Sequence, residues 1–139
     1  MVVVIVGTIG LLQELHNFFG GHKRHSVFLE LQKTENQGRL RSLKRVSDTT
    51  RSWRSVEDGV NTLLDCYTVV LLSLEKMKEV SIDAATVNSA SGLVTRMHDL
   101  RNILCLDILR CLYSSVMQFE IIVKVYSKHS VSNYYSFLY

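Results

Sequence analysis

The chain has 139 residues, of which 47% are hydrophobic and 21% are charged, and its formal net charge is +3. This length corresponds to one domain with a single core and argues against a multi-domain enzyme, while the apolar content excludes a chain that is disordered by composition. Proline is absent, although average usage predicts roughly seven residues, and this favours long uninterrupted helices. We therefore expect one all-α domain over residues 1–139, an irregular bundle of about five helices.

The N-terminal segment, residues 2–19, carries two competing signals. Its β-branched start has strand propensity, and the run VVVIVGTIG resembles a strand that enters a nucleotide-binding turn. A dinucleotide site would also need a third glycine and a following β–α alternation, which the sequence lacks. Apolar residues instead recur at helical spacing, at Ile5, Ile9, Leu12, Leu15 and Phe19. We predict a helix that ends at Gly20 and is too short to cross a bilayer.

A second helix is expected over residues 25–37, with its apolar side chains facing inward. His22 and His25 lie three residues apart and share one helix face, a spacing found among metal ligands. Because no Cys, Asp or Glu lies nearby at ligand spacing, we predict a solvated basic start of the helix, with no metal and no cofactor.

The positive charge of the chain is concentrated in one segment. From Arg39 to Arg54 there are six bases and one acid, so the remaining ten bases and twelve acids leave a charge of −2 elsewhere. In nucleic-acid-binding proteins Arg and Lys side chains bind phosphates, and a Trp beside them stacks on an unpaired base. The alternative is a solvated loop in which Trp53 is a buried anchor for the next helix. The candidate nucleic-acid contacts are Arg39, Arg41, Lys44, Arg45, Arg51, Trp53 and Arg54.

The clearest helical pattern follows the basic segment. Apolar residues are spaced alternately by four and three over three heptads, at Val56, Val60, Leu63, Tyr67, Val70, Leu74 and Met77. Further apolar residues lie off this seam and predict a helix buried on more than one side, at the centre of a bundle.

The C-terminal third predicts two more helices. Asp83 is the expected N-cap of a helix over residues 84–100, and residues 101–124 are again apolar at helical spacing. Residues 126–139 lose this period and are rich in tyrosine, so we expect a loose tail or an element whose partner is missing.

The three cysteines indicate the compartment. Cys66, Cys105 and Cys111 form no C-x-x-C pair, cannot pair completely and lie in apolar surroundings. Buried free thiols in a reducing compartment are the favoured interpretation, so we expect a soluble protein of the nucleus or the cytoplasm, with no membrane association.

One stretch of the sequence also resembles a known family. Phe18-Phe19, a basic turn, the phrase LKRVSDT from Leu43, then Arg51, Trp53 and the apolar helix after it are similar to hAT superfamily transposases and to host proteins derived from them. The resemblance implies a helical domain inserted into an RNase H-like catalytic core. It also matches Arg51 and Trp53 to an Arg-Trp pair near the DNA ends, although Ser52 separates the two residues here.

The resemblance further implies loss of catalysis, because the catalytic acidic residues of that family have no counterpart in this sequence. We therefore expect a non-catalytic, transposase-derived helical module that associates with nucleic acid, DNA above all, through the basic segment. The alternative is a structural or protein–protein interaction module, a homo-oligomer or a partner of other helices, in which the seam from Val56 to Met77 packs within the chain or against another copy.

Overall fold

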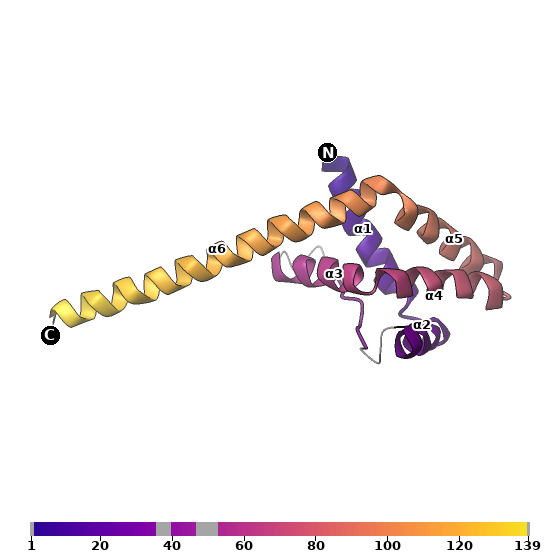
Figure 1. Cartoon of the computed structure of the whole chain (residues 1–139), viewed down its shortest axis with the longest axis horizontal. Helices are drawn as coiled ribbons and strands as arrows, with labels where there is room; N and C mark the ends of the chain where they lie inside the picture. Colours follow the sequence, from indigo (N-terminus) through magenta and orange to yellow (C-terminus); the bar gives the residue numbers. More distant parts are fainter. Residues whose placement is uncertain (1, 36–39, 47–52, 139) are drawn as a thin grey trace.

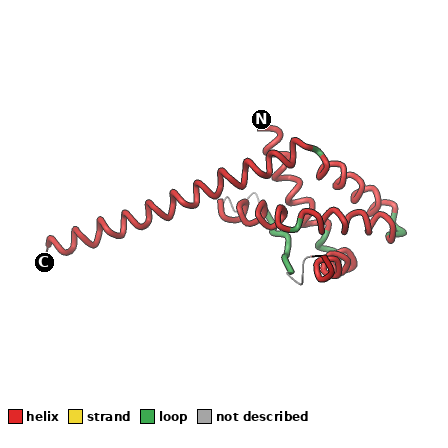
Figure 2. Tube along the Cα trace, viewed as in Figure 1, coloured by secondary structure: helices red, strands yellow, loops and turns green. Residues whose placement is uncertain are grey.

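A computed structural model describes residues 2–35, 40–46 and 53–138 of the chain. Within these ranges the protein has six helices and no strand (Figures 1 and 2), so the all-α prediction is confirmed with one helix more than expected. The helices are α1 (Val2–Phe18), α2 (His22–Glu35), α3 (Trp53–Asp65), α4 (Tyr67–Val80), α5 (Ala84–His98) and α6 (Leu100–Leu138).

The N-terminal segment is helical, as its period predicts, and its strand propensity does not prevail. Leu12, Leu15 and Phe19 of the predicted stripe are buried in the core, and Ile5 and Ile9 are partly buried against it. The helix ends in a turn at Gly20, whose N–H donates to the carbonyl of Asn17. Burial of one long apolar face therefore outweighs the local preference of β-branched residues.

The prediction of one continuous helix from Val56 to Met77 is wrong, because the structure has two helices there. The chain turns at Cys66, which separates α3 from α4. The buried thiol of Cys66 donates to the carbonyl of Thr62 at 2.8 Å, and the same carbonyl also accepts from the N–H of Cys66 at 3.1 Å, so both groups of this residue bond the preceding turn. The inward direction of the seam is confirmed, since Val60, Leu63, Val70, Leu74 and Met77 are all buried.

Asp83 is the N-cap of α5, as predicted. Its carboxylate accepts hydrogen bonds from the backbone N–H of Ala85 and Thr86 at 3.2 and 3.3 Å, and from the Thr86 hydroxyl at 2.8 Å. These bonds, the Thr86 hydroxyl above all, hold the pKa of Asp83 below its usual value. The cap fixes where the chain reverses between α4 and α5.

The C-terminal segment predicted as a loose tail continues α6 to Leu138. No glycine or proline follows Gly92, so nothing in the covalent chain stops the helix once Asp99 has started it. α6 packs on α1, α3 and α5 over its first turns and then leaves the bundle (Figure 1). Among the side chains of α6 that the structure describes, the last one buried in the core is Leu109.

The core lies between all six helices. One of its buried polar residues is Thr8 of α1, whose hydroxyl bonds the side chain of Asn102 on α6 at 3.0 Å, while Asn102 donates to the carbonyl of Arg96 at the end of α5. An ion pair between Arg96 and Glu14 ties α5 to α1 on the outside. These contacts hold the start of α6 in one direction relative to the bundle.

Candidate functional site

The part of the basic segment that the structure describes between α2 and α3, residues 40–46, has no regular secondary structure. Its backbone is held by two glutamine side chains from other helices. Gln32 of α2, which is fully buried, donates to the carbonyl of Arg41 at 2.9 Å and accepts from the N–H of Arg41 at 2.5 Å. Gln13 of α1 accepts from the N–H of Val46 at 3.0 Å. The segment is therefore fixed at both ends, although it has no regular secondary structure.

A glycine allows the end of the basic segment to approach α3 closely. Val46 is buried, and a Cβ atom at Gly59 would lie 3.0 Å from its Cγ2 atom, which is too close for ordinary packing. At the other end, the guanidinium of Arg41 pairs with Asp65 at 3.0 Å. Because Asp65 ends α3 and Gly59 lies in its middle, the segment runs antiparallel to this helix.

The predicted nucleic-acid contacts fall into three groups. Arg41 is half-exposed and ion-paired, whereas Lys44, Arg45 and Arg54 are exposed. Arg39 and Arg51 lie outside the described residues. Trp53 is the first residue of α3, and its side chain lies outside the described part of the chain.

Arg54 also lies close enough to α6 to influence a carboxylate there. The pKa of Glu120 is lowered, first by the hydrogen bond and charge of Lys124 and then, more weakly, by the charge of Arg54. Glu57 of α3 likewise bonds Ser114 of α6 at 3.5 Å. The first turns of α3 therefore meet α6 at the point where α6 leaves the bundle.

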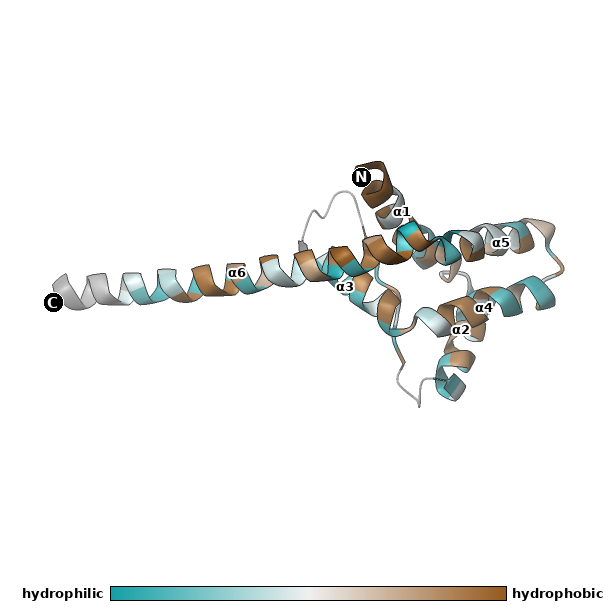
Figure 3. Cartoon of the chain, turned by 45° about the horizontal axis from the view of Figure 1, so that its top comes forward, coloured by the Kyte–Doolittle hydropathy of each residue, from teal (hydrophilic) through white to brown (hydrophobic). Residues whose placement is uncertain are grey.

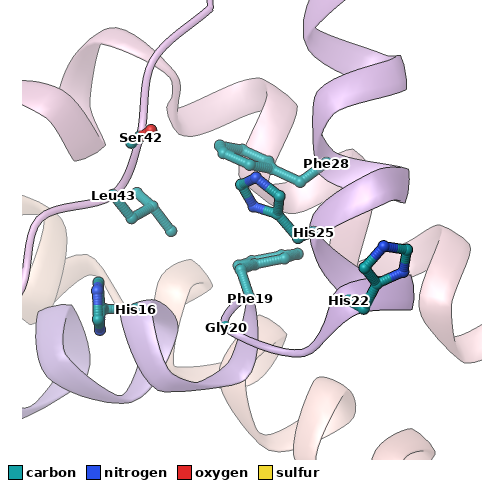
Figure 4. Close-up of a pocket in the computed structure, with 8 residues that line it drawn as sticks. All are labelled: His16, Phe19, Gly20, His22, His25, Phe28, Ser42 and Leu43. Atoms are coloured by element: carbon teal, nitrogen blue, oxygen red, sulfur yellow. The ribbon is translucent and has the colours of Figure 1, made fainter.

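A pocket of about 390 Å³ lies beside the basic segment, between the end of α1 and the start of α2 (Figure 4). Its walls are His16, Phe19, Gly20, His22, His25, Phe28, Ser42 and Leu43. The Nδ1 atom of His16 is buried without a hydrogen-bond partner among the described residues. The described chain contains no group of three His, Cys, Asp or Glu side chains that could hold a metal ion, so these histidines line the pocket without converging.

Sequence reasoning missed that most of the large apolar side chains exposed among the described residues lie on α6, whose hydrophobic residues are brown in Figure 3. Leu104, Ile108 and Ile122 are 52–55% exposed, Phe119 is 68% exposed and Tyr126 is 73% exposed. No single described helix is long and apolar enough to span a membrane, and α1 with α2 passes that test only as a pair bent by 102°. The seam from Val56 to Met77, expected to pack within the chain or against another copy, packs within the bundle.

The cysteines differ from expectation at one position. Cys66 and Cys105 are buried, as predicted, but Cys111 is exposed on α6. Burial and, to a smaller extent, the neighbouring charge of Asp65 raise the pKa of the Cys66 thiol to about 11. The chain therefore has one accessible thiol and one that is strongly protected from ionisation.

Comparisons of the chain with protein-family models, with curated proteins and with solved structures found no match. The resemblance to hAT transposases stays a prediction from the sequence.

Proposed function

We propose that this protein is a helical interaction module that binds an apolar helix of a partner on the exposed face of α6. The observation that supports this function is the contiguous row of apolar side chains on a helix that continues beyond its own bundle. Soluble monomers rarely expose contiguous apolar patches of more than a few hundred Å², and larger ones mark interaction sites.

The magnitude of the exposed surface favours binding. Burying a Leu, Ile or Phe side chain fully contributes about 1.5–3 kcal/mol, so five side chains that are at least half exposed leave roughly 4–9 kcal/mol unrealised in the free chain. This is of the same order as the cost of association, about 4–15 kcal/mol, so a partner must bury most of the row to bind.

Site-specific photo-crosslinking in cells that express the chain tests this function. A benzoylphenylalanine at Phe119 is expected to give discrete crosslinked products. The same group at Ile121 is the matched control, since Ile121 is 54% exposed two residues away on a different face of α6. Equal yields at the two positions, or no product at either, would contradict the proposal.

A second candidate function is supported by the way the basic segment is held. Lys44 and Arg45 are exposed on backbone fixed by Gln32 and Gln13, so these charges are presented without further ordering of the segment. Rigid cationic side chains bind phosphates through counterion release, which makes binding steeply salt-dependent. This arrangement supports association with DNA or another polyanion.

A salt series tests the second function. Single- and double-stranded DNA binding is measured for the wild type and for Lys44→Ala, Arg45→Ala and Arg54→Ala. Each substitution should weaken binding and reduce the slope of log affinity against log salt by about 1. Lys76→Ala, an exposed lysine on α4, is the control. Unchanged slopes for all three variants would remove this candidate.

A further inference from the structure

The exposed apolar row on α6 forms a narrow stripe. At 100° per residue, the side chains of Leu104, Ile108, Cys111, Ser115, Phe119, Ile122 and Tyr126 fall within about 40° of one line along the helix. All seven are exposed, and none is charged. The core residues Leu106 and Leu109 point away from this line, toward α1, α3 and α5, so the stripe lies on the open side of α6.

The spacing of this stripe is palindromic. Its steps are 4, 3, 4, 4, 3 and 4 residues, so the stripe has the same spacing in both directions from Ser115. With a two-fold axis at Ser115, Leu104 of one copy lies opposite Tyr126 of the other. In the same way Ile108 lies opposite Ile122, and Cys111 opposite Phe119. A self-complementary surface of this kind is what an isologous dimer requires.

Resting on the proposed function, we infer that the partner of α6 is a second copy of this chain, with the two α6 helices antiparallel and crossing at Ser115. Each copy then covers the row of the other from Leu104 to Tyr126, about 33 Å of helix. The serine hydroxyls at the axis leave room for close approach of the two backbones.

The available area matches what a stable pair needs. Phe119 and Tyr126 each offer roughly 100–180 Å². Leu104, Ile108 and Ile122, with Leu112 on the flank, bring the face to roughly 650 Å², so a symmetric pair buries roughly 1,300 Å², which lies within the range of about 1,200–2,000 Å² for specific interfaces.

The shape of the molecule also accommodates this arrangement. The part of α6 beyond the bundle is free on all sides from residue 121 to residue 130 (Figure 1). In an antiparallel pair this free part lies along the first turns of the partner's α6, and the two bundles lie at opposite ends. The apolar side chains that the free part exposes are thereby covered by the partner's stripe.

Analytical ultracentrifugation of the purified full chain tests whether the partner of α6 is a second copy. The wild type is expected to be a dimer that persists at high salt, since the stripe has no charge. Ile122→Lys should weaken dimerisation on the order of 100-fold, because two lysines enter each interface. Ile121→Lys is the matched control: the same residue type has nearly equal exposure off the stripe and should leave the dimer intact. A monomeric wild type, or equal effects of the two substitutions, would overturn the inference.

Cysteine crosslinking tests the direction and the register. In a Cys111→Ser background, Ser115→Cys places two thiols at the axis, so oxidation should give a covalent dimer. The native Cys111 should not crosslink, because the two copies of this residue lie about 12 Å apart along the antiparallel helices, beyond the reach of a disulfide. Crosslinking through Cys111 as efficiently as through position 115 would indicate a parallel pair and contradict the proposed arrangement.

The two proposals fail in different ways. If the purified chain is a monomer while Phe119 crosslinks to a different protein in cells, the second copy is wrong and the interaction module stands. If Phe119 gives no crosslink and the chain is a monomer, both are wrong.

Discussion

Replacing Gln32 with alanine should destabilise the protein and release the basic segment. The side chain is fully buried and makes two hydrogen bonds to the backbone of Arg41. A typical net contribution of about 0.5–1.5 kcal/mol for each bond gives about 1–3 kcal/mol, and a buried group left unsatisfied adds roughly another 1 kcal/mol or more. We expect a loss of about 2–4 kcal/mol in the free energy of unfolding.

This loss is a large fraction of the roughly 5–15 kcal/mol of a typical domain. Urea unfolding followed by circular dichroism at 222 nm measures it, and hydrogen exchange at the Arg41 amide reports the segment directly. Gln13→Ala, which removes the single bond to Val46, is the control and should lose about 1 kcal/mol. A change below about 0.5 kcal/mol for Gln32→Ala, with the Arg41 amide still protected, would refute the idea that this side chain holds the segment.

Two further predictions concern the cap of α5 and the thiols. Asp83→Ala should lower Tm at pH 7, and the difference in Tm between wild type and variant should shrink as the pH falls below about 4. The pKa of Asp83 is lowered in the folded protein, so its contribution to stability is fully present above the unfolded value of about 3.9. That contribution is lost as the carboxylate of the folded protein is protonated. A Tm difference that persists at pH 2 would contradict a role for the charge. At pH 8 iodoacetamide should modify Cys66 and Cys105 only after denaturation, whereas Cys111 should react rapidly in the Ile122→Lys variant, in which the dimer is weakened and the stripe is uncovered, as mass spectrometry of the intact protein can show. Rapid modification of Cys66 in the native protein would show that its burial is wrong.

The sequence by itself determined the helical class and the positions of several elements. In a chain without proline and with apolar residues at helical spacing, helices pair the backbone N–H and C=O groups and at the same time put the apolar side chains on one face that can be buried. The cap at Asp83 was readable for the same reason, since a short side-chain oxygen before a helix has a local partner in the next turn. The basic character of the segment around Lys44 is equally a local property.

Only the tertiary structure decided which apolar faces are covered. The seam from Val56 to Met77 and the stripe from Leu104 to Tyr126 are alike in period, yet the first is buried within the bundle and most of the second is exposed. The hydrogen bonds between Gln13 and Val46 and between Gln32 and Arg41 cross 33 and 9 residues of the chain, so no helical or strand period reports them. The apolar period of a helix predicts which residues share a face. Whether that face is buried depends on elements from elsewhere in the chain, so periodicity alone does not predict it.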